Sequence, residues 1–219
     1  MSLEEQIINQ YSKRSVNSNL YAGGHYVDYV QKEIKETIGA FLNQEFKEFE
    51  NLSLLEIGAG NGTNAEIFLS LGFNIQNIYF NELLPERILA IKSNYPNNTI
   101  FRGNAIGINC DEKFDIIFQS TVFTSVLNQV DRQKLAEKML SLLKPNGMIL
   151  WYDFIYNNPK NKDVRKVDVK ELKLLFVKSS SIYYKKITLA PPIGRKVKKF
   201  YKLFNLPFLR SHILAIIKK

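Results

Sequence analysis

The sequence predicts an α/β fold in which a doubly wound, mostly parallel sheet of seven strands carries helices on both faces. Short runs rich in β-branched and aromatic residues alternate with stretches of helical period, a pattern typical of parallel sheets wrapped by helices. The chain has 219 residues, 45% of them hydrophobic, which is enough for one substantial domain. No internal repeat or low-complexity linker divides it.

Seven segments combine apolar character with β-branched or aromatic residues, so we expect them to be strands. They are Leu52–Ile57, Asn77–Asn81, Thr99–Arg102, Phe114–Gln119, Met148–Phe154, Ile182–Leu189 and Ser211–Ile217. Stretches of helical period lie between most of them, and this alternation favours parallel strand pairs joined by crossover helices.

Helices are expected between the strands, with one more ahead of the first strand. They are Val27–Leu42, Asn64–Leu71, Pro85–Ser93, Asp131–Leu143 and Asp168–Val177. Pro85 suits the first helical position, and Asp131 and Asp168 suit N-caps because a carboxylate accepts hydrogen bonds from free backbone N–H groups. Glu171 follows Asp168 by three residues, as in a capping box. Residues 144–147 form a Lys-Pro-Asn-Gly turn that ends the Asp131 helix.

The composition excludes secreted, membrane-spanning, collagen-like and disordered proteins. The single cysteine, Cys110, cannot form an intramolecular disulfide, which fits a reducing compartment. The apolar runs are far shorter than the roughly 20 residues of a membrane span, and the first residues do not resemble a signal peptide. We therefore expect a cytoplasmic protein.

Positive charge is concentrated in the last third of the chain. Residues 160–219 contain 17 basic and 3 acidic residues, whereas the whole chain has a net charge of +9. Such asymmetry indicates either an anionic partner or a set of solvated exterior lysines. Gly194–Phe204 is predicted to be one amphipathic basic helix, which packs on its own domain or rests among anionic lipids at the inner face of a membrane.

A glycine-rich turn follows the first predicted strand. The strand ends in Glu56, and Gly58, Gly60 and Gly62 come before the next helix. Glycine at these positions allows a tight turn and a close backbone approach to a ligand. A dinucleotide fingerprint would require glycine where Thr63 stands. A cofactor with a cationic amine suits the acid at Glu56 better than a pyrophosphate does.

These residues resemble the first motif of Rossmann-like S-adenosylmethionine-dependent methyltransferases, an acid followed by G-x-G-x-G. Glu82, 26 residues after Glu56, matches the family's acid for the ribose hydroxyls, and Asn104 stands where the family usually has aspartate. The resemblance implies that S-adenosylmethionine is the cofactor and that the last strand is antiparallel. It also implies cofactor binding by Glu56, Gly58, Ala59, Gly60, Asn61, Gly62, Glu82, Leu83, Asn104, Ala105 and Gln119.

Other segments narrow the resemblance to a bacterial methyltransferase group whose genes tend to lie among glycan-assembly genes. The similar segments are residues 83–88, 122–127, 150–159, 188–192 and 209–212. The similarity covers roughly residues 50–217, so we expect the methyltransferase domain at 50–219. Residues 1–49 are expected to form an N-terminal helical cap or lid.

Three residues are candidates for catalysis. His212 begins the last predicted strand, which the family topology places at the cofactor edge, and a neutral histidine there would remove a proton from an acceptor hydroxyl. His25 lies in a glycine-containing segment that could close over the cofactor. Asp153 ends a strand and would act as a base or orient a hydroxyl. For each, a purely structural role is the alternative, and no metal ligand set is assigned.

The sequence therefore predicts a methyltransferase that acts on a sugar hydroxyl of a glycan or of a phosphorylated or lipid-linked glycan precursor. Peripheral contact with an anionic membrane or with glycan-assembly enzymes is a further expectation. Methylation of RNA or of another small molecule is one alternative, although the chain shows no added RNA-binding module and nucleic acid is not the expected partner. A catalytically silent, partner-binding subunit is the other alternative.

Overall fold

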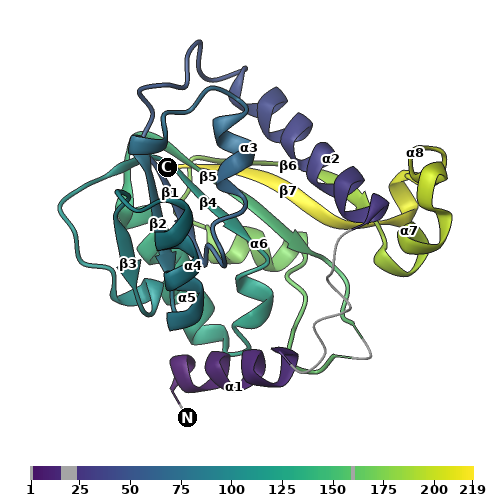
Figure 1. Ribbon diagram of the computed structural model, residues 1–219, viewed down its shortest axis with the longest axis horizontal. Helices are drawn as coiled ribbons and strands as arrows, with labels where there is room; N and C mark the ends of the chain where they lie inside the picture. The colour runs from purple at the N-terminus through teal and green to yellow at the C-terminus, as the bar shows by residue number, and fades with distance from the viewer. Residues whose placement is uncertain (1, 16–23, 159–160) are drawn as a thin grey trace.

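The computed structural model describes residues 2–15, 24–158 and 161–219. Its centre is a seven-stranded sheet in the order β3-β2-β1-β4-β5-β7-β6 (Figure 1). The strands are β1 (Leu54–Ile57), β2 (Ile78–Glu82), β3 (Ile100–Arg102), β4 (Phe114–Ser120), β5 (Leu143–Phe154), β6 (Ser181–Leu189) and β7 (Arg210–Lys218). β7 is antiparallel to its neighbours β5 and β6, and the other pairs are parallel. The predicted fold class is confirmed.

Helices cover both faces of this sheet. The α-helices of the described residues are α1 (Leu3–Ser15), α2 (His25–Leu42), α3 (Ala65–Leu69), α4 (Pro85–Asn94), α5 (Gln129–Leu142), α6 (Val169–Leu175), α7 (Pro191–Val197) and α8 (Tyr201–Phe204). Apolar side chains of α2, α3 and α4 pack on one face, and those of α5 and α6 pack on the other. Within the described ranges, no helix is long and apolar enough to cross a membrane.

The order of the strands reverses between β1 and β4, and this reversal marks the edge of the sheet where a ligand is expected. β2 and β3 extend the sheet on one side of β1, whereas β4 and β5 extend it on the other. Doubly wound sheets bind ligands at the carboxyl ends of the strands at such a switch point. The register aligns Ile57 at the end of β1 with Asn81 of β2 and Gln119 of β4. The three strands therefore end level along one edge.

The prediction that Asp131 caps a helix is wrong, because α5 begins earlier. Asn128 is the N-cap, and its Oδ1 accepts hydrogen bonds from the backbone N–H groups of Val130 at 2.8 Å and Asp131 at 3.4 Å. Asp131 lies inside the first turn, where its charge favours the helix N-terminus. The predicted turn at 144–147 is an irregular part of β5. The register between β5 and β4 shifts there, and Asn146 has a φ of 64°.

The prediction of one continuous helix over Gly194–Phe204 is also wrong. α7 ends at Val197, Lys198 has a φ of 45°, and a 3-10 turn and the short α8 follow. Tyr201 gives the physical reason, because its side chain is 2% exposed and its hydroxyl donates to Glu33 Oε2 at 2.8 Å. Burial of this ring and hydroxyl against α2 outweighs the helical propensity of the segment.

A buried arginine connects α5 to the loop that precedes α6. The Arg132 side chain is fully buried. Its Nη1 donates to Glu171 Oε1 at 2.6 Å and to the Lys166 carbonyl at 3.1 Å. Its Nη2 donates to the Arg165 carbonyl at 2.8 Å, and its Nε donates to the Val126 carbonyl at 2.6 Å. One side chain therefore fixes the 165–166 backbone beside the segment that follows β4.

We predict that Arg132→Met lowers the free energy of unfolding by about 3 kcal/mol, because it leaves three carbonyls without this donor and leaves the Glu171 carboxylate paired with Arg165 alone. Urea unfolding followed by circular dichroism measures this change. Lys32→Met is the control, since the Lys32–Glu36 pair is exposed and 3.9 Å apart, and such pairs contribute about 0–1 kcal/mol. Equal stability of Arg132→Met and the wild type would contradict the role given to Arg132.

Candidate functional site

The glycine-rich loop closes over the end of β1. Gly58, Gly60 and Gly62 have φ angles of 63°, 59° and 78°, a region that side chains with a Cβ rarely adopt. A Cβ on Gly58 would lie 2.6 Å from Cγ2 of Val122, which follows β4. The backbone of the loop therefore approaches the β4 end more closely than any other residue type would permit.

Glu56 lies buried beneath this loop, with 1% of its surface exposed. Its Oε1 accepts a hydrogen bond from Asn64 Nδ2 at 2.8 Å, whereas Oε2 has no hydrogen-bond partner among the described residues. Burial raises the pKa of Glu56 to about 8, the Asn64 hydrogen bond opposes that rise, and the nearby Glu82 carboxylate adds to it. A buried oxygen without a partner fits a ligand that brings a cationic or N–H donor.

Glu82 ends β2 and holds the loop in place. Its Oε2 accepts from the Gly60 N–H at 2.6 Å, and its Oε1 accepts from the N–H groups of Leu83 at 2.8 Å and Leu84 at 3.0 Å. A carboxylate has about four lone-pair sites, so three accepted hydrogen bonds leave capacity for one more donor. Glu82 can therefore position the loop and still accept from a ligand hydroxyl.

Asn104 follows β3 and caps a short 3-10 helix. Its Oδ1 accepts from the Ile106 N–H at 3.0 Å, and its own backbone N–H donates to Glu4 Oε1 of α1 at 3.3 Å. Ala105 is buried beside it. The Asn104 amide oxygen thus holds its own turn and retains one lone pair for a further donor.

A cavity opens at this edge of the sheet. It is lined by residues from α1, from the ends of β1 to β4 and from the segments that follow them: Leu3, Glu4, Ile7, Tyr11, Ile57, Gly58, Asn81, Glu82, Leu83, Arg87, Gly103, Asn104, Ala105, Ser120, Thr121, Val122, Ser125, Val126 and Leu135. Five of the predicted cofactor residues line it, namely Gly58, Glu82, Leu83, Asn104 and Ala105. Glu56, Ala59, Gly60, Asn61 and Gly62 belong to the adjoining strand end and loop without lining it.

The sequence predicted a helical cap over residues 1–49, but it did not predict the helix α1 or the side chains of α1 that face the cavity. Leu3, Ile7 and Tyr11 recur at intervals of four residues and face the cavity from one side of α1. The Arg87 guanidinium lies 4.3 Å from the centre of the Tyr11 ring, and Gln6 Nε2 donates to the Ser125 carbonyl at 3.1 Å. The four-residue spacing is the signal that would have identified this apolar face. The predicted domain boundary at residue 50 stays a prediction.

Gln119 does not line the cavity, because its side chain is fully buried. Its Oε1 accepts from the Val122 N–H at 2.9 Å, and its Nε2 donates to the Tyr152 carbonyl at 3.3 Å. The same Tyr152 carbonyl accepts from the Thr121 N–H at 2.8 Å, and Thr121 has a φ of 57°. Gln119 therefore supports the turn that follows β4, and cofactor contact by its side chain stays a prediction.

Asp153 is enclosed in the protein. Its carboxylate is fully buried, with Oδ1 accepting from the Phe154 N–H at 3.0 Å and Oδ2 accepting from the Thr124 N–H at 3.3 Å. Burial raises the pKa of Asp153 to about 7, against the effect of these hydrogen bonds and of the Arg132 charge. In this arrangement Asp153 supports the backbone that follows β4 and has no surface open to an acceptor.

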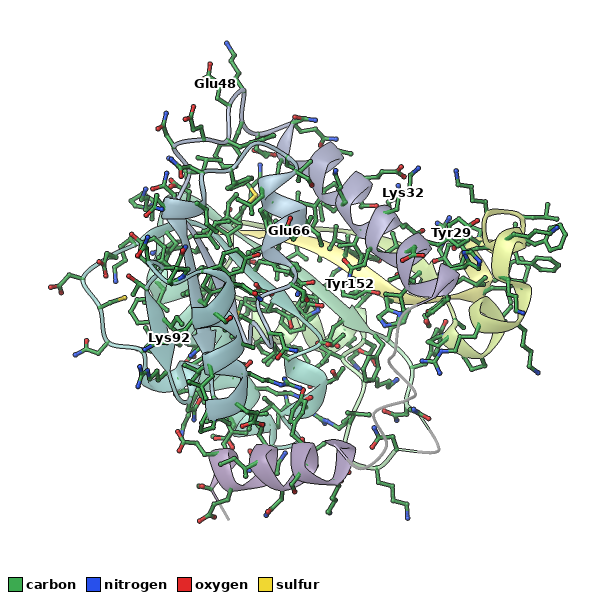
Figure 2. All side chains as sticks on the ribbon, viewed as in Figure 1. Tyr29, Lys32, Glu48, Glu66, Lys92 and Tyr152 are labelled. Carbon is green, nitrogen blue, oxygen red and sulfur yellow. The ribbon has the colours of Figure 1, made fainter. Side chains whose placement is uncertain are left out.

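His212 lies at the beginning of β7, paired with Phe154 near the end of β5. Its ring stacks on Tyr152, with centroids 4.9 Å apart and planes inclined by 7°. Nδ1 hydrogen-bonds to the Ser211 hydroxyl at 2.9 Å. Burial lowers the pKa of His212 to about 4, so the imidazole is neutral near pH 7. Figure 2 labels Tyr152, which lies toward the middle of the molecule.

His25 is exposed and is the first residue of α2. Neither His25 nor His212 lines the cavity beside the glycine loop. Part of the glycine-containing segment before His25, residues 21–23, lies outside the described residues. The antiparallel direction of β7 brings the beginning of that strand to the same sheet edge as the ends of β4 and β5. His212 is therefore on the cofactor edge of the sheet, whereas His25 is on a helix.

Comparison with known proteins gives one family match. Residues 55–151 match the model described as "Methyltransferase domain". No curated protein matches the chain. The matched segment runs from β1 to β5 and so includes the glycine loop, Glu82 and Asn104.

Many solved structures share the fold. A SAM dependent methyltransferase from Archaeoglobus fulgidus has 16% identity and a TM-score of 0.59, over 89% of this chain and 99% of that chain. SAM-bound CalS10, an amino pentose methyltransferase from Micromonospora echinaspora, has 10% identity and a TM-score of 0.58, over 94% and 96%. The glycopeptide N-methyltransferase MtfA complexed with sinefungin has 13% identity and a TM-score of 0.58, over 90% and 94%.

At these identities the likeness to solved structures shows the fold alone, and the domain match adds the activity. The unpartnered Glu56 oxygen and the glycine loop fit the cationic amine of the cofactor that this class of enzyme uses. The domain at residues 55–151 and the Rossmann-like fold together identify the chain as an S-adenosylmethionine-dependent methyltransferase.

Proposed function

We propose that this methyltransferase acts on a hydroxyl oxygen of a sugar, in a glycan or in a phosphorylated or lipid-linked glycan precursor. The observation that carries the proposal is the position of His212 at the cofactor edge of the sheet, paired with Phe154 near the end of β5. A hydroxyl acceptor loses a proton on methylation, and a neutral imidazole can take that proton. Among the described residues His212 Nε2 has no hydrogen-bond partner, so it is the nitrogen available for this step.

The surroundings of His212 support an uncharged acceptor. The Tyr152 ring stacks on it, and the Tyr152 hydroxyl hydrogen-bonds to Thr188 Oγ1 at 2.9 Å. Tyr156, which follows β5, is 53% exposed and offers an aromatic face. Aromatic faces and neutral polar groups suit the apolar and hydroxyl faces of a sugar ring. A similar solved structure is named an amino pentose methyltransferase, which supports a sugar acceptor on this fold.

The cofactor is assigned to the cavity beside the glycine loop. When bound, S-adenosylmethionine supplies a methyl group on a sulfonium centre, and this group passes to the acceptor oxygen as its bond to sulfur breaks. Glu56 Oε2 would accept from the amino group of the cofactor, and the free lone pair of Glu82 would accept from a ribose hydroxyl. Asn104 and Ala105 would border the adenine, and α1 would exclude water from the cavity.

These roles concern binding and alignment, which are the main demands on an enzyme whose methyl donor is already activated. Alignment of reacting groups can supply roughly 7–11 kcal/mol of barrier reduction. Proton removal by a positioned base contributes about a hundredfold to ten-thousandfold. The protein therefore needs a rigid cofactor cavity and one base, and it needs no ionised group at the acceptor oxygen.

We predict that affinity for S-adenosylhomocysteine rises between pH 6 and pH 8. Glu56 has a pKa of about 8 without ligand, raised above its usual 4.5, so its proton must leave when an ammonium group binds. Below that pKa the affinity should increase by up to about tenfold for each pH unit. Calorimetric titration at several pH values measures this slope.

Glu56→Gln should weaken binding at least tenfold at pH 8, since an ion pair with a buried carboxylate is lost, and it should abolish the pH dependence between pH 6 and pH 8. Glu66→Gln on α3 is the control, because Glu66 is exposed and its Oε1 accepts from the Tyr95 hydroxyl, whereas Glu56 is buried with an unpartnered oxygen. A pH slope that persists in Glu56→Gln would assign the proton to another group.

The acceptor is tested with methyl-labelled cofactor and four acceptor classes: nucleotide sugars, lipid-linked saccharides, amino sugars with free or acetylated nitrogen, and RNA. We predict label in a sugar ether that survives removal of the acetyl group. Label only on a free amino sugar would indicate nitrogen as the acceptor atom, an alternative that the amino pentose methyltransferase supports. Label only in RNA would refute the sugar proposal, and Glu56→Gln gives the background.

We predict that His212→Ala lowers kcat about a hundredfold or more and leaves the affinity for S-adenosylhomocysteine unchanged. His212→Gln is the second variant, because it preserves more of the packing on Tyr152. The rate of the wild type should fall only below about pH 5, where an imidazole with a pKa of about 4 becomes protonated. Wild-type kcat in both variants, with a loss in His25→Ala instead, would transfer the role to His25.

A further inference from the structure

The segment between β6 and β7 exposes large apolar side chains. Within nine residues, the exposed fractions are 53% for Phe200, 70% for Leu203, 41% for Phe204, 42% for Leu206 and 75% for Phe208. We call these five residues the apolar tip. Clusters of exposed apolar side chains on a folded protein mark interaction sites more often than isolated ones do. Figure 1 shows α7 and α8 projecting at one end of the molecule.

Positive charge surrounds the apolar tip. Residues 191–210 contain six basic residues and no acidic residue. Five of the basic residues are exposed: Arg195, Lys196, Lys198, Lys199 and Lys202. The sixth, Arg210, is engaged with the Asn205 side chain and carbonyl and with the Lys186 carbonyl, each at 3.0 Å. The tip therefore combines apolar side chains with five exposed cations.

A part-buried polar network holds the segment on the body of the protein. Glu33 of α2 accepts from the Tyr201 hydroxyl at 2.8 Å, from Asn205 Nδ2 at 2.7 Å and from the Thr188 N–H at 3.0 Å. The Tyr201 ring stacks on Tyr29 of α2, with centroids 5.2 Å apart and planes inclined by 8°. The segment therefore has a fixed inner side, and the apolar tip cannot turn inward without breaking this network.

Gly194 adds a second point of attachment. A Cβ there would overlap the Tyr26 ring, and the Tyr26 hydroxyl donates to the Leu189 carbonyl at 3.0 Å. α7 is thus packed closely on the first turn of α2. Because both ends of the segment are anchored, the exposure of the apolar tip is a property of the folded state.

We propose that the apolar tip and its five cations dock on the surface of an anionic lipid bilayer. Apolar side chains enter the boundary between headgroups and acyl chains, and lysines and arginines contact lipid phosphates. Nucleic acid would engage the cations and leave the aliphatic side chains uncovered. A second copy of the chain would bring like charges together at this surface. A bilayer would cover the aliphatic and the aromatic side chains of the tip and would also contact its five cations.

Sedimentation of the full chain with vesicles tests the proposal. We expect at least tenfold stronger partitioning onto vesicles of phosphatidylcholine mixed with phosphatidylglycerol than onto phosphatidylcholine alone, and a loss of binding at high salt. Leu203→Ser/Phe208→Ser and Lys198→Glu/Lys199→Glu should each reduce partitioning at least tenfold. None of these four residues lines the cofactor cavity, so affinity for S-adenosylhomocysteine should stay at the wild-type level.

Matched controls carry the same substitution types elsewhere. Leu174→Ser/Val177→Ser removes side chains that are 62% and 73% exposed, and Lys170→Glu/Lys173→Glu changes the charge by the same amount on α6. Both controls should partition like the wild type. Equal loss in the controls and the tip variants would refute docking through this surface, as would equal partitioning onto the two vesicle types.

Two further results would also overturn the proposal. Dimerisation in light scattering that the Leu203→Ser/Phe208→Ser variant abolishes would make the tip an interface between copies of the chain. Binding of a single-stranded RNA at physiological salt that depends on Lys198 and Lys199 but not on Leu203 and Phe208, without vesicle binding, would make it a nucleic-acid surface. Because none of these measurements needs an acceptor, they are independent of the proposed sugar methylation.

Discussion

The site depends on the burial of the Glu56 carboxylate beneath a loop that only glycine can form. Burial makes the ionised carboxylate costly, as the pKa of about 8 reflects, so a ligand that carries a cation gains by pairing with it. The loop in turn depends on Glu82, which accepts from the Gly60 N–H and anchors it to the end of β2. A close approach of Gly58 to Val122 brings the β4 end into the same structure. The Glu56 and Glu82 carboxylates and the ends of β1, β2 and β4 therefore hold one another in position.

Two polar networks, each centred on one charged side chain, stabilise the segments around this edge, one on each face of the sheet. On the α5 face, Arg132 holds the backbone at 165–166, and the Arg165 N–H donates to the Thr124 carbonyl. On the α2 face, Glu33 gathers donors from the end of β6 and from the segment before β7. Both networks use one charged side chain to satisfy several backbone or side-chain groups, which is the condition for burying a charge at acceptable cost. They fix loops that would otherwise have few packing contacts.

Sequence reasoning succeeded where one local pattern is sufficient and failed where a second residue, local or distant, competes with it. Asp131 is a good N-cap by itself, but the amide of Asn128 satisfies two N–H groups one turn earlier and so begins the helix. The 194–204 segment has a helical period, but the burial of Tyr201 against α2 breaks it. For the 194–204 segment the deciding partner is Glu33 on α2, which is far away in the chain. Gln119 is at the expected strand end and its amide is engaged with two backbone groups, so cofactor contact by its side chain stays a prediction.

The fold class, the antiparallel last strand, the methyltransferase activity and the cofactor followed from the sequence and its family resemblance alone. The strand pattern and the glycine spacing depend on neighbouring residues in the chain, so they can be recognised without knowledge of the tertiary contacts. Only the tertiary structure showed that α1 forms a wall of the cavity, that Asp153 is enclosed, and that the apolar tip is held outward. Those outcomes depend on contacts between residues far apart in the chain, such as Glu4 with Asn104 and Glu33 with Tyr201, which no local spacing encodes.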